Sequence, residues 1–191
     1  MPFFEALMGF SLLFGKPPIP AGNAIVARSA TTVAPSYMVT LTAYNAVPAQ
    51  TDASPFETAS GAPSNPQIVA ARSADLAGKL PFGTIIELDG SSISSGDTCG
   101  YGIVAPLIGY RIIADTMNSR YHNRIDVLFD TKAEYARAAG KPLNAATILG
   151  VCKGVTVRVV GHIDIANLKS LPTTQRELAM LLGRNSTLAL R

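Results

Sequence analysis

Residues 110–130, YRIIADTMNSRYHNRIDVLFD, are the stretch that decides the fold. An apolar run, residues 110–114, leads directly into Asp115, and a polar, basic loop follows. A second run rich in β-forming residues, 124–129, carries Asp126 between two aliphatic neighbours. A carboxylate inside a strand-like apolar run is unfavourable unless it is paired, hydrogen-bonded or functional. The stretch therefore predicts two strands joined by a loop, with Asp115 and Asp126 as candidate site residues.

Four more strands are predicted outside this stretch. Alternating apolar and polar residues mark the longer ones, and Gly, Pro, Ser or Asn bounds each of them. The six predicted strands are residues 37–44, 67–71, 84–88, 110–115, 124–129 and 155–161. Short strands at regular spacing with turn signals between them are typical of a small β-barrel or β-sandwich. The chain is therefore expected to be mainly β.

Two helices are predicted from capping boxes. In the first, residues 131–140, Thr131 precedes Glu134 by three positions and a glycine ends the segment. The second, residues 174–183, opens with another such box and also ends at a glycine. Residues 101–109 are apolar but contain a proline, so no regular element is expected there.

Composition limits the classes of function. The 191 residues suffice for one well-buried domain with tails, and with 48% hydrophobic and 15% charged residues the chain is globular rather than disordered. The net charge of +3 comes without a block of Lys and Arg, so no nucleic-acid footprint is indicated, although a weak basic bias suits an anionic polymer. Cys99 and Cys152 could bridge in an oxidising compartment or remain two buried thiols. No Cys/His spacing indicates a metal site.

The N-terminal part has two interpretations. Residues 3–14 form an apolar run that is interrupted by Glu5 and is too short to span a bilayer. It fits the apolar region of a signal peptide, which would place the protein in the periplasm or cell wall, although no basic residue precedes it. It also fits an amphipathic helix packed on the domain. The expected organisation is an N-terminal segment and linker (1–35), a β domain (36–162) and a helical tail (163–191).

Four motifs follow one another in a recognisable order: TAY (42–44), TDASPFETASG (51–61), LPFGT (80–84), and ADT followed by NRIDVLF in the opening stretch. Their order and strand positions resemble the three-aspartate, or 3D, domain. That domain occurs in the C-terminal part of membrane-bound lytic transglycosylase A and is related more distantly to rare lipoprotein A and the expansins. The resemblance covers residues 39–160. It implies a six-stranded double-psi β-barrel, with one inserted helix here, that acts on the glycan strands of peptidoglycan without a cofactor.

The resemblance also implies roles for the acids. In that family the aspartate ending the ADT-type strand is the proposed catalytic acid, and here it is Asp115. The aspartate of the following strand corresponds to Asp126, for which a supporting role is expected. The place of the family's first aspartate holds Arg72 or Ser73, and Asp75 lies close enough in the sequence to substitute for it.

The expected chemistry needs only one carboxyl group. It protonates the leaving glycosidic oxygen and then, as the base, removes the proton from the sugar's 6-hydroxyl, which attacks the anomeric carbon. Such an acid needs a raised pKa, which burial and a nearby carboxylate provide. Asp115 follows three apolar residues and has Asp126 as its expected neighbour. The alternative is that Asp115 is an ordinary turn former at a strand end.

Three candidate substrate contacts lie upstream of the acids. Asp52 and Thr58 belong to the polar segment 45–66, which is too long to be an idle connection in a compact domain. They are expected to line the glycan cleft; the alternative is that Asp52 and Thr51 cap turns around Pro55. Tyr44 ends a strand and could stack on a sugar ring or hydrogen-bond the acid, or be half-buried packing.

Two more candidates lie in the loop between the acids. Arg120 and Tyr121 could contact the carboxylates of peptidoglycan stem peptides. The alternative is a solvated loop in which Arg124 pairs with Asp126 or Asp130.

The rival to an enzyme is a non-catalytic, expansin-like glycan-binding barrel, or a structural barrel inside the cell. A binding platform usually has exposed aromatic residues, and the absence of Trp favours the enzyme.

Overall fold

The computed structural model describes residues 34–51 and 54–183. Two compact units, Met1–Thr32 and Val33–Arg191, make up the chain, and the described residues all belong to the second. The apolar run at residues 3–14 and the candidate Asp52 therefore lie outside the described residues.

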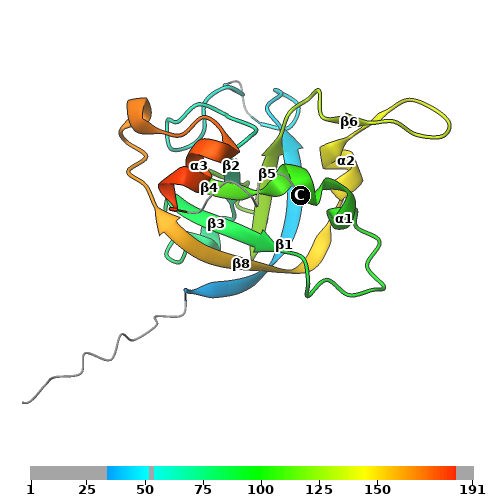
Figure 1. Cartoon of the computed structure of the whole chain (residues 1–191), viewed down its shortest axis with the longest axis horizontal. Helices are drawn as coiled ribbons and strands as arrows, with labels where there is room; N and C mark the ends of the chain where they lie inside the picture. The colour runs from blue at the N-terminus through cyan, green and yellow to red at the C-terminus, as the bar shows by residue number, and fades with distance from the viewer. Residues whose placement is uncertain (1–33, 52–53, 184–191) are drawn as a thin grey trace, which may run out of the picture. The chain divides into compact units, whose positions relative to one another are not determined.

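Six strands close into a barrel in the order β1–β5–β2–β4–β3–β8, which confirms the mainly β prediction (Figure 1). The pairs β1–β5 and β2–β4 are parallel, and the other four pairs are antiparallel. The barrel strands are β1 (Ser36–Asn45), β2 (Val69–Arg72), β3 (Thr84–Asp89), β4 (Tyr110–Thr116), β5 (Arg124–Phe129) and β8 (Cys152–His162).

Short elements surround the barrel. They are α1 (Tyr101–Ile108), α2 (Ala145–Leu149), α3 (Gln175–Leu181), 3₁₀ turns at Ala74–Leu76 and Leu168–Ser170, and a two-stranded sheet of β6 (Glu134–Tyr135) and β7 (Leu143–Asn144). The predicted C-terminal helix is α3, and its capping box is formed, because the Thr174 hydroxyl accepts a hydrogen bond from the Glu177 N–H at 3.2 Å. No described helix has the length and apolar character needed to cross a membrane.

The prediction of a helix at residues 131–140 was wrong. The segment instead forms a turn and the β6–β7 hairpin, and the helix between β5 and β8 is α2. The Asn144 side chain donates to the carbonyls of Asp130 and Thr131, and Asp130 accepts from the Lys132 N–H, so this region is held as a turn. A helix at residues 131–140 would have no buried face and too little packing to outweigh these bonds.

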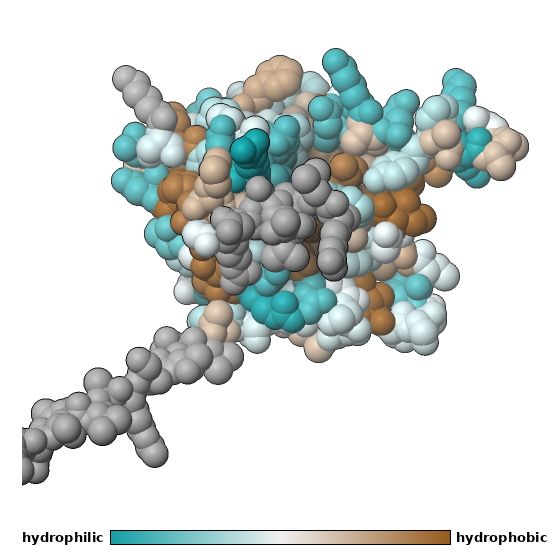
Figure 2. All heavy atoms as spheres, viewed as in Figure 1, coloured by the Kyte–Doolittle hydropathy of each residue, from teal (hydrophilic) through white to brown (hydrophobic). Residues whose placement is uncertain are grey.

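The helix α1 was not expected, because Pro106 lies inside it. Proline removes one helical hydrogen bond, but two side chains of α1, Val104 and Ile108, are buried in the core. Tertiary packing thus overrides the local propensity. Figure 2 shows hydrophobic atoms at the surface on the side where Figure 1 places α1 and α2, and Ile103 and Leu107 of α1 are exposed.

The buried side chains form two clusters that alternate along the strands. The first has members from all six barrel strands, so it is the interior of the barrel; Leu41, Ile113 and Val127 belong to it. The second contains Tyr44, Leu128 and other strand residues whose positions alternate with those of the first cluster, together with Leu178 of α3. It therefore lies on the outer face, beneath α3 and the segment before β2.

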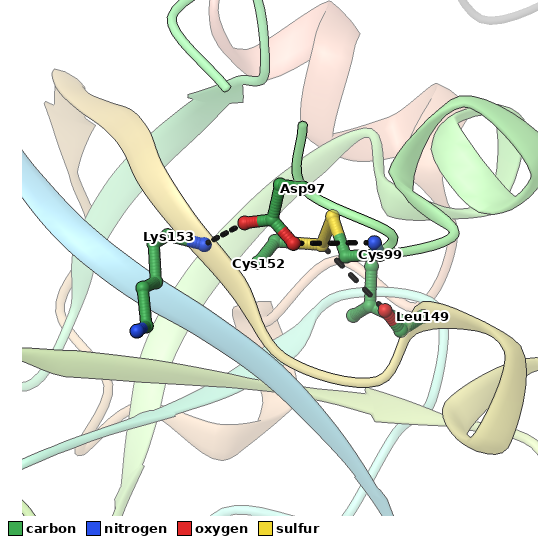
Figure 3. Close-up of a disulfide and its surroundings, with 5 residues drawn as sticks. All are labelled: Asp97, Cys99, Leu149, Cys152 and Lys153. Atoms are coloured by element: carbon green, nitrogen blue, oxygen red, sulfur yellow. Dashed lines mark hydrogen bonds between the residues drawn. A yellow bond between two sulfur atoms is a disulfide. The ribbon is translucent and has the colours of Figure 1, made fainter. Parts of the chain in front are cut away.

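Cys99 and Cys152 form a disulfide, one of the two alternatives left open by the sequence (Figure 3). The bridge ties the loop before α1 to the start of β8. Asp97 supports both sides, because its carboxylate accepts from the backbone N–H groups of Cys99 and Lys153. The loop and the strand are therefore joined covalently and by hydrogen bonds.

Candidate active site

The two predicted acids are brought to either side of one residue. Ala71 of β2 pairs with Asp115 of β4 on one side and with Asp126 of β5 on the other. A register shift between Ala70 and Ala71 makes this possible, since Ala70 pairs with Ile113 and the next pair skips one residue of β4. Strands in a sheet lie about 4.8 Å apart, so the two acidic Cα atoms are roughly 10 Å apart across a side chain no larger than a methyl group.

Asp115 is held by three hydrogen bonds. The Tyr44 hydroxyl donates to Oδ2 at 2.8 Å, and the N–H groups of Ala59 and Thr116 donate to Oδ1 at 3.0 and 2.9 Å. The side chain is half-buried, and its bond to Ala59 lies at the surface. Asp115 is thus fixed in position and open to solvent on one side.

Asp126 lies deeper, on the outer face of β5. Its Oδ1 is buried and, like the hydroxyl of the opposing Thr42, has no well-formed hydrogen bond to any described residue. Burial raises the pKa of Asp126 to about 6, and the charge of Asp115 adds to this rise. The nearby Thr42 hydroxyl and the charge of Arg124 oppose the rise without cancelling it. Asp126 therefore has the raised pKa that a proton-donating carboxyl group needs.

Tyr44 interacts electrostatically with both acids and with the buried cation Arg111. Burial, followed by the charges and hydrogen bond of the acid pair, raises the pKa of Tyr44 well above its ordinary value, so its hydroxyl remains a donor to Asp115. Arg111 is completely buried and donates to five backbone carbonyls of α1, β2, β5 and the segment before β2. Burial lowers the pKa of Arg111 to about 9, so it keeps its charge at pH 7. Sequence reasoning missed Arg111, although an arginine between Tyr110 and Ile112 was a visible signal.

The TASG motif forms a turn that holds Asp115. The Thr58 side chain is buried, and its hydroxyl donates to the Ala62 carbonyl at 3.0 Å, which closes the turn. Ser60 N–H donates to the Ala114 carbonyl at 3.1 Å, and Ala59 N–H binds Asp115 itself. The turn is thus docked onto the end of β4. Thr58 therefore supports the turn that holds Asp115.

Arg120 and Tyr121 form a stack with Arg124. Both guanidinium carbons lie over the Tyr121 ring, 4.8 Å from its centroid for Arg120 and 4.7 Å for Arg124. Neither Asp126 nor Asp130 forms an ion pair with Arg124, so that alternative does not hold.

The place of the family's first aspartate is occupied by residues with structural contacts. Arg72 is buried against the Phe82 ring and donates to the Leu80 carbonyl at 2.8 Å. Ser73 is fully buried and accepts from the Arg124 N–H. Asp75 accepts from the Asn123 N–H, and the Ser73 hydroxyl is the main cause that lowers the pKa of Asp75. Asp75 therefore anchors the β4–β5 loop.

An apolar pocket in the described structure does not include either acid. A pocket of about 90 Å³ lies under residues 165–173 and includes Ala62, Ile112 and Ala114, but neither acid. Its lining is mainly apolar and contains no carboxyl, imidazole or thiol group. In the described ranges no three carboxylate, imidazole or thiol groups are grouped as metal ligands would be.

Comparisons with protein-family models, with curated proteins and with solved structures find no match to this chain.

Proposed function

We propose that this chain is a double-psi β-barrel enzyme, similar to three-aspartate domains, that cleaves the glycan strand of peptidoglycan. The observation that carries the proposal is the acid pair, in which Asp115 and Asp126 flank Ala71 and Asp126 has a raised pKa. The two parallel strand pairs within a closed six-stranded barrel support the double-psi form.

The two acids have different parts in this proposal. Asp115 is the more accessible, and it transfers the proton to the glycosidic oxygen and then accepts one from the 6-hydroxyl. Asp126 lies behind it and retains a proton up to about pH 6, which limits the negative charge of the pair. Because the acids interact, the pH dependence of cleavage belongs to the pair and not to either residue alone. Tyr44 and the TASG turn keep Asp115 in place.

The disulfide supports export. Disulfides persist in oxidising compartments and are rare in the cytosol, where thiols are kept reduced. The Cys99–Cys152 bridge therefore favours the periplasm or the cell wall, where the proposed polymer is found.

The second candidate is a glycan-binding barrel without catalysis. It is favoured by the structural contacts of Arg72 and Ser73, which leave no acid at the place of the family's first aspartate. In this case Asp115 and Asp126 would accept hydrogen bonds from sugar hydroxyls.

Digestion of purified peptidoglycan tests the proposal. Wild type, Asp115→Asn and the matched control Asp130→Asn are incubated with the polymer, and the products are identified by mass spectrometry. Anhydro-muropeptides from wild type and the control, but not from Asp115→Asn, are expected. Reducing ends from hydrolysis would contradict the lytic reaction. No products, with the protein still sedimenting with the polymer, would favour the binding barrel.

A further inference from the structure

Two guanidinium groups share one aromatic ring in the loop before β5. Arg120 and Arg124 both lie within 5 Å of the Tyr121 centroid, at 4.8 and 4.7 Å, and Arg120 also donates to the Tyr121 hydroxyl at 2.9 Å. We call these three residues the arginine–tyrosine stack. Guanidinium groups favour aromatic faces, so both cations are held against the same ring.

The stack takes part in none of the ion pairs within the described ranges. The ion pairs there join His122 to Asp75, and Arg158 to Glu87 and Asp89. The Nε of Arg124 is buried without a hydrogen bond to a described residue. The charge of Arg124 acts on Asp126 without forming an ion pair, so both guanidinium groups keep N–H donors for an anion.

The backbone of the loop is fixed before any ligand arrives. Arg120 N–H donates to the Asn118 side chain at 3.1 Å, and Tyr121 N–H donates to the Asn118 carbonyl at 3.0 Å. Asn123 N–H binds the Asp75 carboxylate, and Arg124 N–H donates to the Ser73 hydroxyl. A preorganised loop loses little entropy on binding, which favours a site over a merely solvated loop.

The stack borders the acid pair. Arg124 lies two positions before Asp126 on the same face of β5, and its charge lowers the pKa of Asp126. A ligand group held by Arg124 would therefore lie next to the place where the glycosidic bond is expected.

We propose that the arginine–tyrosine stack binds a carboxylate of the glycan, so that the preferred substrate is a sugar polymer with acidic substituents. The planar guanidinium fork matches a carboxylate and can bind it through two parallel hydrogen bonds. In peptidoglycan this carboxylate belongs to the lactyl group or the attached peptide. The choice of peptidoglycan as the polymer rests on the proposed function. The carboxylate site itself is argued from the arginine–tyrosine stack and does not depend on that function.

Binding to peptidoglycan before and after amidation of its carboxyl groups tests the inference. Asp115→Asn protein is used so that the polymer stays intact, and sedimentation gives the affinity. Amidation, Arg120→Gln and Arg124→Lys are each expected to weaken binding roughly tenfold, because each removes charge-assisted or bidentate hydrogen bonds. Arg137→Gln, which removes the same charge from the exposed β6–β7 hairpin, should bind as the parent does. Equal binding of both polymers would overturn the inference and leave the proposed function intact.

A monosaccharide pair tests the anion site without the polymer. N-acetylmuramic acid and N-acetylglucosamine differ by the lactyl carboxylate, and NMR can follow the side-chain Nε–H signals of Arg120 and Arg124. Only the acidic sugar should shift these signals, and Arg120→Gln should remove the response. Equal shifts with both sugars, or none, would overturn the anion site. A selective shift in a protein that does not cleave peptidoglycan would separate this site from the proposed function.

Discussion

At the scale of the residue, the two acids are held in contrasting ways. Asp115 accepts three hydrogen bonds, whereas the buried Oδ1 of Asp126 has none that is well formed. Burial without adequate donors disfavours the charged form of a carboxyl group, and this is the main cause of the raised pKa of Asp126. The folded protein is therefore destabilised when Asp126 ionises.

Asp126→Asn is expected to stabilise the fold at neutral pH. The pKa of Asp126 rises from 3.8 to about 6 on folding, so its favourable contribution is present below pH 4 and is lost as the pH rises through 6. At pH 7.5 the variant should be more stable by about 2 kcal/mol, and at pH 4 the difference should nearly vanish. Urea unfolding at both pH values measures this difference. Asp164→Asn, at an exposed turn, is the control; a difference for Asp126→Asn that does not change with pH would contradict the prediction.

Tyr44→Phe removes one hydroxyl and leaves the ring in the outer cluster. Asp115 then loses one of its three donors, and the unfolding free energy should fall by about 1 kcal/mol. Peptidoglycan cleavage should fall by about tenfold if this bond positions the acid. The release of soluble muropeptides gives the rate. Activity equal to that of wild type would show that Ala59 and Thr116 position Asp115 without Tyr44.

At the scale of the element, α3 is docked onto the barrel by the buried Leu178 and by the hydrogen bonds of Gln175. Gln175 accepts from the Tyr110 N–H at 2.9 Å and donates to the Tyr110 carbonyl at 2.7 Å, as a neighbouring strand would. Gly109 makes room for it, because a Cβ there would lie 2.3 Å from the Gln175 side-chain oxygen. The φ and ψ angles of Gly109, 53° and −153°, are also close to a region that only glycine adopts readily.

Gly109→Ala should therefore detach α3. We expect a loss of about 3 kcal/mol from the strained backbone and the clash with Gln175. Faster amide exchange in α3 should accompany it. Gly78→Ala is the matched control, since a Cβ at Gly78 meets nothing within 4 Å and its φ is ordinary. Similar stabilities of the two variants would contradict this account of the docking.

At the scale of the whole molecule, the disulfide is the main covalent constraint in the described fold. Cys99 and Cys152 are 53 positions apart. Closing a loop of that length in the unfolded chain should stabilise the fold by about 4 kcal/mol.

The double variant Cys99→Ser, Cys152→Ser should lose about this free energy of unfolding, and a reducing agent should have the same effect on wild type. Urea unfolding with and without the reductant measures both. The double variant itself should not respond to reductant. If reduction left wild type unchanged, the bridge would not form in solution.

The sequence predicted the barrel strands well because their alternation reflects burial directly, as in β1 and β8. It failed at residues 131–140, where hydrogen bonds from the distant Asn144 decide the conformation. It also failed at α1, where core packing of Val104 outweighs a proline. Local propensity does not contain these long-range contacts.

The site was predictable in its members but not in its arrangement. Asp115, Asp126 and Tyr44 were all chosen from motifs, yet their meeting depends on a register shift at Ala71. The raised pKa of Asp126 depends on a buried environment that a strand pattern does not reveal. The arginine–tyrosine stack likewise requires the loop to be folded.

The parallel pairing of distant strands has a kinetic consequence. Tyr44 meets Asp115 across 71 positions, and Asn45 meets Phe129 across 84. Barrels built from such remote contacts fold slowly, in milliseconds to seconds, because large loops must close before their contacts stabilise them. No local fragment holds both acids and Tyr44, so under the proposed function a chain whose barrel has not closed would be inactive. Recovery of activity after dilution from urea would therefore coincide with closure of the whole barrel.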